Sequence, residues 1–191
     1  MKRFERLFAR AAASLPSDKS ARFQTILIVN APSFATYAYS VLSSLSPGKL
    51  YTRRSLMLGS SCRPVRIHRP DERTLIVRPE GGFLVRPGSP WNHREMEQLL
   101  FDERCGLQSL DRIYRDASPF TKGQRIELIG MTVEITAITE DGRPVEAAFR
   151  FLMRLENQFL RWIRWENGSF VPFLPPAVGE TVTLPAATLE R

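Results

Sequence analysis

The chain has 191 residues, of which 43% are hydrophobic and 25% are charged, and its formal net charge is +7. This composition predicts a folded domain with a substantial core and excludes an intrinsically disordered chain. Apolar runs such as ILIV at 26–29 fall far short of the roughly 20 residues that a membrane-spanning helix needs. The sequence therefore predicts no transmembrane segment.

Cysteine and histidine are scarce, which limits the chemistry available to the chain. Cys62 and Cys105 are the two cysteines, His68 and His93 are the two histidines, and no Cys-x-x-Cys spacing occurs. We therefore expect no metal and no cofactor. The cysteines are interpreted as buried thiols, with one disulfide as the alternative. Few histidines also make hydrolytic catalysis a less favoured expectation than binding.

Positive charge is concentrated in the first half of the chain. Residues 1–22 hold six basic and two acidic side chains, and residues 50–86 hold eight arginines against three acids. Residues 87–191 are net acidic, with twelve basic and fifteen acidic side chains. This asymmetry predicts contact of the first half with an anionic membrane surface or an acidic protein partner.

The N-terminal segment reads as a basic amphipathic arm over residues 1–22. Phe4, Leu7, Phe8 and Ala11 follow helical spacing. A packed helix is the favoured interpretation, and a membrane-surface helix or a targeting segment stays open. The segment lacks the continuous apolar region of a secretory signal. We expect a cytoplasmic protein or one peripheral to the membrane.

A strand, a turn and a helix are predicted next. The run Thr25–Val29 is apolar on both faces, which is typical of a strand covered on both sides. Ser33 is placed to cap a helix that ends before the SPG sequence at 46–48. Ligands of α/β proteins collect at such turns, so Asn30 and Ser33 are candidate ligand-binding residues of a small-molecule or hydrolytic site. The simpler alternative gives them only capping and loop contacts.

Apolar residues then recur at every second position, which predicts strands. LYTRRSLML can form one strand, and PVRIHRPDERTLIVRP predicts a hairpin. The predicted inward face consists of Val65, Ile67, Leu75 and Val77. The candidate contacts for an anion or a partner are Arg53, Arg54, Arg66, His68 and Arg78. A solvated arginine-rich face is the simpler interpretation, and nucleic-acid binding through the arginines of this basic 50–86 face is an alternative that we regard as less favoured.

The remaining chain is divided into a helical insert and further strands. Ser89 and Pro90 open a predicted helical insert over residues 87–118. Two strands with inward residues follow on either side of the turn EDGRP, and a short strand is predicted at Thr181–Leu184. The predicted inward residues of the paired strands are Val133, Ile135, Val145, Ala147, Phe149 and Phe151.

The stretch LRWIRWENGSFVPF, residues 160–173, is a candidate base-stacking surface for nucleic acid because it combines tryptophan and arginine. A two-residue Asn167-Gly168 turn would place Trp165 opposite Phe170 on an apolar face. Trp162 would then lie on a half-exposed face beside Arg164, as a cation–π pair. We therefore interpret the stretch as a structural hairpin, with nucleic-acid contact as the alternative.

Four stretches of the chain carry a resemblance to a known group. They are TILIVNAPSFATYAYSVL, RPDERTLIVRPEGGFL, GMTVEITAITEDGRPVEAAFRF and RWIRWENGSFVPFLPPAVGETV. Together they resemble the C-terminal extramembrane region of uncharacterised bacterial polytopic membrane proteins, over residues 24–184. The resemblance implies a position near a membrane but no activity, and this chain lacks the transmembrane helices of that group.

The predicted fold class is α+β. It comprises one strand-turn-helix unit, antiparallel hairpins forming a sheet or small barrel, and the helical insert, in a single domain over residues 23–191 that follows the arm. The predicted function is a non-catalytic extramembrane or membrane-proximal interaction domain. The sequence leaves the oligomeric state open.

Overall fold

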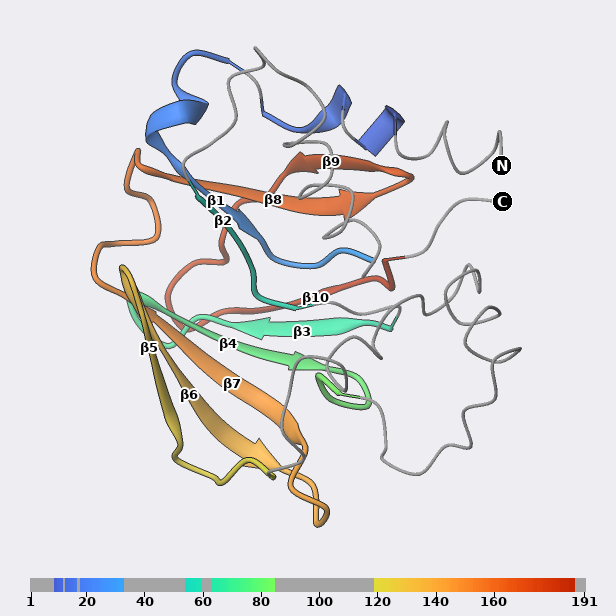
Figure 1. Cartoon of the computed structure of the whole chain (residues 1–191), viewed down its shortest axis with the longest axis vertical. Helices are drawn as coiled ribbons and strands as arrows, with labels where there is room; N and C mark the ends of the chain where they lie inside the picture. Colours follow the sequence, from blue (N-terminus) through green and yellow to red (C-terminus); the bar gives the residue numbers. More distant parts are fainter. Residues whose placement is uncertain are drawn as a thin grey trace.

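The computed structural model describes residues 9–11, 13–16, 18–32, 54–59, 63–84 and 119–187 (Figure 1). Strands make up 45% of these described residues and helical turns 7%. The ten strands of this described part form two sheets, and one 3-10 turn, η1 (Ala21–Phe23), precedes the first strand. The described architecture is therefore mostly β.

The smaller sheet has the strand order β2-β1-β8-β9. Its members are β1 (Thr25–Ile28), β2 (Arg54–Met57), β8 (Leu160–Glu166) and β9 (Ser169–Pro172). Strand β1 runs parallel to both β2 and β8, whereas β8 and β9 form an antiparallel hairpin. Distant parts of the sequence therefore meet at the centre of this sheet.

The larger sheet is antiparallel throughout and has the order β10-β3-β4-β7-β6-β5. Its members are β3 (Val65–His68), β4 (Thr74–Pro79), β5 (Arg125–Leu128), β6 (Met131–Ile138), β7 (Pro144–Phe151) and β10 (Thr181–Leu184). Figure 1 shows this sheet below the smaller one, with β5 at its outer edge.

The main core lies between the two sheets. Strand β1 sends Leu27 and, just past its end, Val29 into this core, while Ile26 and Ile28 enter a second cluster on the opposite face of the smaller sheet. All four side chains are at most 2% exposed. Burial of each such side chain contributes about 1.5–3 kcal/mol, so the strand is held from both faces, as its apolar pattern predicts.

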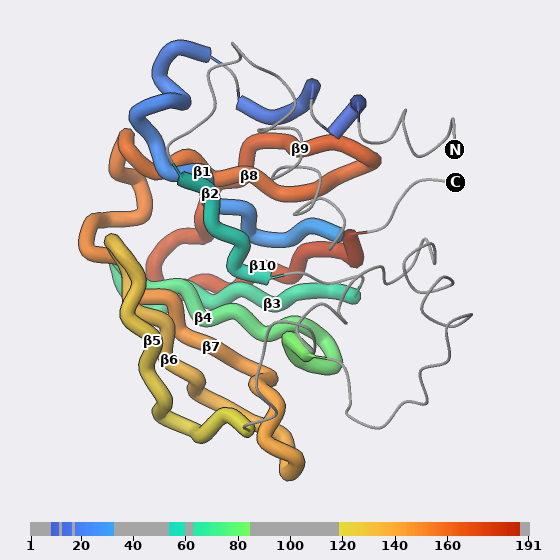
Figure 2. The backbone as a smooth tube through the Cα atoms, in the orientation of Figure 1, coloured from blue at the N-terminus to red at the C-terminus, as the bar shows by residue number. Residues whose placement is uncertain are grey.

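The N-terminal segment covers the second face of the smaller sheet, as the tube in Figure 2 shows. Ala11 and Leu15 are buried in the second cluster. Arg10 donates Nη2 to the carbonyl of Asn167 at 2.8 Å, and the amide of Phe170 donates to Ser14 Oγ at 2.9 Å. These contacts favour the packed interpretation of the arm over a free membrane-surface helix.

The α+β prediction is wrong. It drew its helical content from the segment after Ser33 and from the insert 87–118, and both lie outside the described residues. In the described part, β1 joins a mixed sheet, and the hairpins are divided between two sheets rather than forming a single sheet or a small barrel. None of the described helical residues forms a span long and apolar enough to cross a membrane.

The first predicted hairpin has the predicted inward face, and the second has the predicted register. Ile67 pairs with Val77 and Arg66 pairs with Arg78 in the first hairpin. Trp165 pairs with Phe170 in the second, across a turn in which Asn167 has a φ of 48° and Gly168 a φ of 78°. Of the residues predicted to lie inward around the EDGRP turn, Val145 is only half-buried and the other five are buried. Strand β10 begins and ends where the sequence predicts.

The predicted half-exposed position of Trp162 is wrong. Its side chain is 6% exposed and packs edge-on against Phe151 at 5.3 Å between ring centroids. Its indole nitrogen donates to the Leu155 carbonyl at 2.7 Å, and Arg164 donates instead to Glu166 at 2.7 Å. The larger sheet covers this face of β8. The alternation of side chains along a single strand cannot predict that a second sheet packs against it.

Candidate functional site

An open cleft of about 510 Å³ lies against the larger sheet, beside the end of β4 and the turn between β6 and β7. Its polar lining includes Arg66, Arg78, Glu80, Thr139, Arg143 and Thr183. We call it the basic cleft, because three of these side chains are cationic and one is acidic. Its walls come from β3, β4 and β10 together with two turns.

Arg66 and Arg78 form the centre of the basic cleft. They are direct partners on the antiparallel strands β3 and β4, and both are exposed. Like charges placed opposite each other on a sheet destabilise it. Arg78 Nη1 lies 3.7 Å from Glu146 Oε2, whereas Arg66 has no ion pair with any described residue. The pair therefore leaves positive charge that a bound anion would neutralise.

Arg143 forms a wall of the cleft and is already committed to other partners. Its Nε donates to both carboxylate oxygens of Asp141, at 3.0 and 2.9 Å, and its Nη1 donates to the Leu84 carbonyl at 3.1 Å. Hydrogen bonds from the Thr139 hydroxyl and then from Arg143 hold the pKa of Asp141 below its ordinary value. The ionised Asp141 thus compensates Arg143. Arg78 has Glu146 beside it, and Arg66 is the cleft arginine that forms no ion pair with a described residue.

The Gly81-Gly82 turn brings backbone close to the start of β7. Gly82 has a φ of 86°, and a Cβ at this position would lie 3.0 Å from the Pro144 carbonyl oxygen. Glycine accepts this backbone conformation without steric cost, and a side chain would not fit. The turn therefore packs closely against the start of β7 and forms one wall of the basic cleft.

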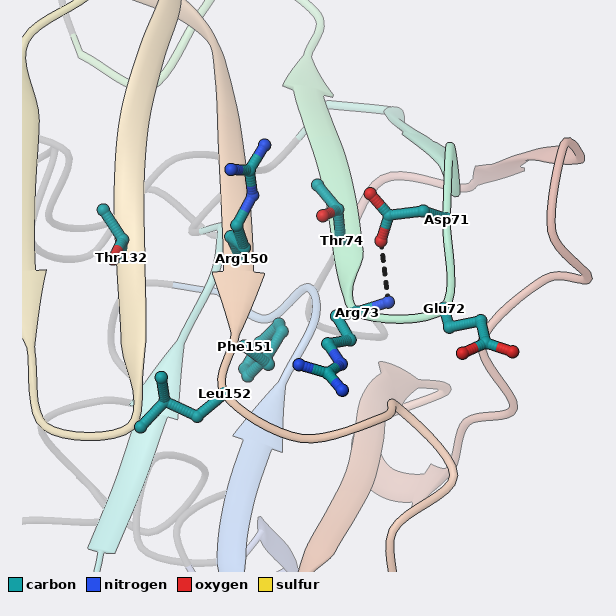
Figure 3. Close-up of a pocket in the computed structure, with 8 residues that line it drawn as sticks. All are labelled: Asp71, Glu72, Arg73, Thr74, Thr132, Arg150, Phe151 and Leu152. Carbon is teal, nitrogen blue, oxygen red and sulfur yellow. Dashed lines mark hydrogen bonds between the residues drawn. The ribbon is translucent and has the colours of Figure 1, made fainter.

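A second hollow, of about 420 Å³, lies at the other end of the larger sheet (Figure 3). In Figure 3 the Asp71 carboxylate faces Thr74, and the guanidinium groups of Arg73 and Arg150 point in different directions. The Thr74 side chain is buried, and Arg150 is its cross-strand neighbour. Polar groups of both signs therefore line this hollow.

Asp71 keeps its charge in the second hollow. Partial burial raises the pKa of its carboxyl, but hydrogen bonds, led by that from the Arg73 amide at 2.8 Å, hold the pKa below its ordinary value overall. A carboxylate that stays ionised would repel an anion. The basic cleft is therefore the better candidate site for an anionic ligand.

Of the predicted contact residues, the structure brings Arg66 and Arg78 together and separates the rest. His68 follows Arg66 on the same strand face, but its Nδ1 lies 3.0 Å from Thr181 Oγ1 and 3.1 Å from the Glu180 carbonyl, which ties it to β10. Arg54 is on the smaller sheet and donates to the Ile129 carbonyl. Arg53 lies outside the described residues.

Asn30 directly follows β1 and is 1% exposed. Its Nδ2 donates to the Pro185 carbonyl at 3.0 Å, and its own carbonyl accepts the Trp165 amide at 2.8 Å. These bonds tie three segments of the chain together, which is the simpler role predicted for Asn30. Ser33 lies outside the described residues, so a small-molecule or hydrolytic site at this turn stays a prediction.

Sequence reasoning missed the cleft residues that come from other elements. Thr183 is on β10, whose pairing with β3 places it opposite Arg66. Thr139 and Arg143 are on the turn between β6 and β7. The EDGRP turn and the last strand are both predicted from sequence, but no local signal indicates that they flank β3 and β4.

Metal binding and relatives give no further guidance on the site. Among the described residues, no group of three or more histidine, cysteine or carboxylate side chains is arranged to hold a metal ion. Comparison of the chain with protein-family models, with curated proteins and with solved structures finds no match. The candidate site therefore rests on its geometry and charge.

Proposed function

We propose that the chain is a non-catalytic interaction domain and that its basic cleft binds an acidic segment of a protein partner. The observation that carries this proposal is the direct pairing of Arg66 with Arg78, two exposed cations of which Arg66 has no ion pair in the described part of the chain. A bound carboxylate would relieve the repulsion between them and form charge-assisted hydrogen bonds with both.

The surroundings of the pair support an acidic peptide as the ligand. Thr183 and Thr139 add hydroxyl groups to the lining of the cleft. The cleft is open rather than enclosed, which suits a segment of a larger molecule. Such a role agrees with the resemblance to extramembrane regions, where a domain would contact another protein near the membrane.

The structure weakens the argument for nucleic-acid binding through the same arginines. Arg54 is at the start of β2 on the smaller sheet, whereas Arg66 and Arg78 lie on the larger sheet near the opposite end of the strands. A phosphate backbone needs a continuous basic track. The described arginines of this group form one local pair, which favours a small acidic ligand.

Fluorescence anisotropy with a labelled decaglutamate peptide tests the proposal at low and moderate salt. The double variant Arg66→Gln/Arg78→Gln removes both cleft charges, and we expect it to bind about tenfold more weakly or worse. Binding of the unaltered chain should weaken as salt rises. The substitutions are at exposed positions, so the fold should persist.

The matched control is Arg22→Gln/Arg54→Gln, which removes the same amount of charge at the other end of the strands. This variant should bind the peptide nearly as well as the unaltered chain. Equal losses in the two double variants would mean that net charge, and not the cleft, attracts the peptide. Absence of peptide binding by the unaltered chain would also overturn the proposal.

A further inference from the structure

Large exposed apolar side chains gather at one end of the strands. Within the described residues they are Phe23, Leu128, Ile129, Leu152, Phe159, Leu174 and Val178. They lie in or beside the segment before β1, the β5–β6 turn, the β7–β8 loop and the β9–β10 connection, which Figure 1 shows on the left. We call this region the apolar end.

Backbone contacts show that the loops of the apolar end are neighbours. The Leu152 amide donates to the Gly130 carbonyl at 3.1 Å, beside Ile129. The Thr25 amide donates to the Phe159 carbonyl at 2.8 Å, and Thr25 is the strand partner of Arg54. Arg54 in turn donates to the Ile129 carbonyl, which links β2 of the smaller sheet to the β5–β6 turn of the larger sheet.

Four side chains on neighbouring loops of the apolar end are highly exposed. Ile129 is 85% exposed, Leu152 73%, Phe23 64% and Phe159 49%. Single exposed apolar residues are ordinary on protein surfaces, but a gathering of them indicates an interaction site. Loops at the opposite end, such as 80–82, 139–143 and 167–168, carry none of the large exposed apolar side chains of the described chain.

Cations without carboxylate partners accompany these apolar side chains. Arg22 lies over the Phe23 ring, with its guanidinium carbon 4.7 Å from the ring centroid. Described cations at this end that form no ion pair with a described residue include Lys19, Arg22, Arg54 and Arg73. Three carboxylates of this end are taken by arginines, in the pairs Asp18–Arg161, Glu72–Arg154 and Glu156–Arg69. Asp71, Glu127 and Glu180 form no ion pair with a described arginine, so the unpaired charge is net positive.

We propose that the apolar end docks on the surface of an anionic lipid bilayer. Phe23, Ile129, Leu152 and Phe159 enter the interface between headgroups and acyl chains, and the neighbouring arginines contact lipid phosphates. Apolar tips on separate loops suit a bilayer because each side chain partitions into it independently. A protein partner would instead need a matching hollow for each tip. Apolar burial combined with attraction to anionic lipid is the usual basis of interfacial binding.

This inference does not rest on the function proposed for the basic cleft. The cleft is near the opposite end of the strands, so docking through the apolar end leaves it facing away from the bilayer. One chain can then hold a membrane surface at one end and an acidic partner at the other. Either surface can fail in experiment without affecting the other.

Vesicle flotation of the full chain tests the inference, with phosphatidylcholine vesicles that contain or lack phosphatidylglycerol. We expect binding to the anionic vesicles that decreases with salt. Ile129→Ser/Leu152→Ser should lower the partition coefficient at least tenfold, since two apolar side chains that would enter the bilayer are lost. Arg22→Gln/Arg54→Gln should lower it several-fold, and the matched charge control Arg66→Gln/Arg78→Gln should leave it unchanged.

A gain-of-binding variant separates docking from misfolding. Ile129→Trp should bind the anionic vesicles more tightly, because tryptophan favours the membrane interface. The emission of the new tryptophan should shift to the blue on binding, whereas Trp162 and Trp165 are already buried and should contribute little to the shift. Failure of the unaltered chain to bind anionic vesicles would overturn the inference. Unchanged binding by Ile129→Ser/Leu152→Ser, together with no blue shift in Ile129→Trp, would also overturn it. So would a loss of binding that occurs only in Arg66→Gln/Arg78→Gln.

Discussion

The two ends of the strands are built on the same sheets but carry different loops. At the end with the basic cleft, tight glycine turns at 81–82, 142 and 168 pack closely and expose polar side chains. At the apolar end, longer connections over 152–159 and 173–180 expose Leu152, Phe159, Leu174 and Val178. The core between the sheets does not require this difference. The proposed binding of a membrane surface at one end and an acidic partner at the other would account for it.

The largest effect that we expect on stability comes from the glycine turns. Gly142 has a φ of 75°, and a Cβ there would lie 2.4 Å from Pro119 Cβ. Gly142→Ala combines an unfavourable backbone conformation with a clash and should lower the free energy of unfolding by about 3 kcal/mol. Chemical denaturation followed by circular dichroism measures this loss.

Gly130 at the apolar end provides the comparison. Its φ is 88°, but the nearest atom to a Cβ at this position would be Arg54 Nη1, at 4.0 Å. Gly130→Ala should therefore cost about 1 kcal/mol, from backbone conformation alone. Equal costs at the two glycines would show that the turns at the two ends are packed alike.

The N-terminal segment gives the next largest effect. Leu15 is 9% exposed in the second cluster, whereas Phe23, in the turn just before β1, is 64% exposed. Leu15→Ala should lower the free energy of unfolding by about 2 kcal/mol. Phe23→Ala should change it by less than about 0.5 kcal/mol. A Leu15→Ala variant as stable as the unaltered chain would mean that the arm is not packed on the smaller sheet.

The smallest effect concerns one aspartate at each end. A hydrogen bond from Arg161, and then one from Ser20, hold the pKa of Asp18 well below its ordinary 3.8. The pKa of Asp141 is lowered by Thr139 and Arg143. A lowered pKa stabilises the fold above the ordinary value, and this contribution disappears as the pH falls through the folded-state value. Both side chains are exposed to solvent, which screens the effect.

Thermal unfolding between neutral and acidic pH measures this contribution. Asp18→Asn and Asp141→Asn should each be less stable than the unaltered chain at neutral pH. The difference should narrow below about pH 4, where these aspartates begin to take up protons in the unfolded chain while they stay ionised in the folded one. A difference that stays constant down to acidic pH would show that the carboxylate charge contributes nothing.

Local patterns predicted a large part of the fold. Alternation predicted that Ile67 and Val77 share an inward face, and the Asn167-Gly168 turn predicted the pairing of Trp165 with Phe170. These predictions succeed because hairpin register depends on a few adjacent residues and on which face is apolar. The same reasoning failed for the fold class, because the described part of the chain is mostly β and its strands are divided between two sheets.

The candidate site was only half predictable. Arg66 and Arg78 share a face because their hairpin register puts them there, and that register is local. Thr183 and Arg143 join them through sheet neighbours and turns far along the chain. The prediction that Trp162 is half-exposed failed for the same reason. Its burial depends on the larger sheet that packs against β8 rather than on the alternation within β8.

The sequence by itself determined most of the strands, the hairpin turns and the alternation of side chains between the two faces of a hairpin, because these follow from steric and hydrophobic rules that act over a few residues. Only the tertiary structure decided that β1 runs parallel between β2 and β8. It also decided which loops share an end, and so where the basic cleft and the apolar end are. Contacts between distant segments depend on how whole sheet faces pack, and no short stretch of sequence contains that information.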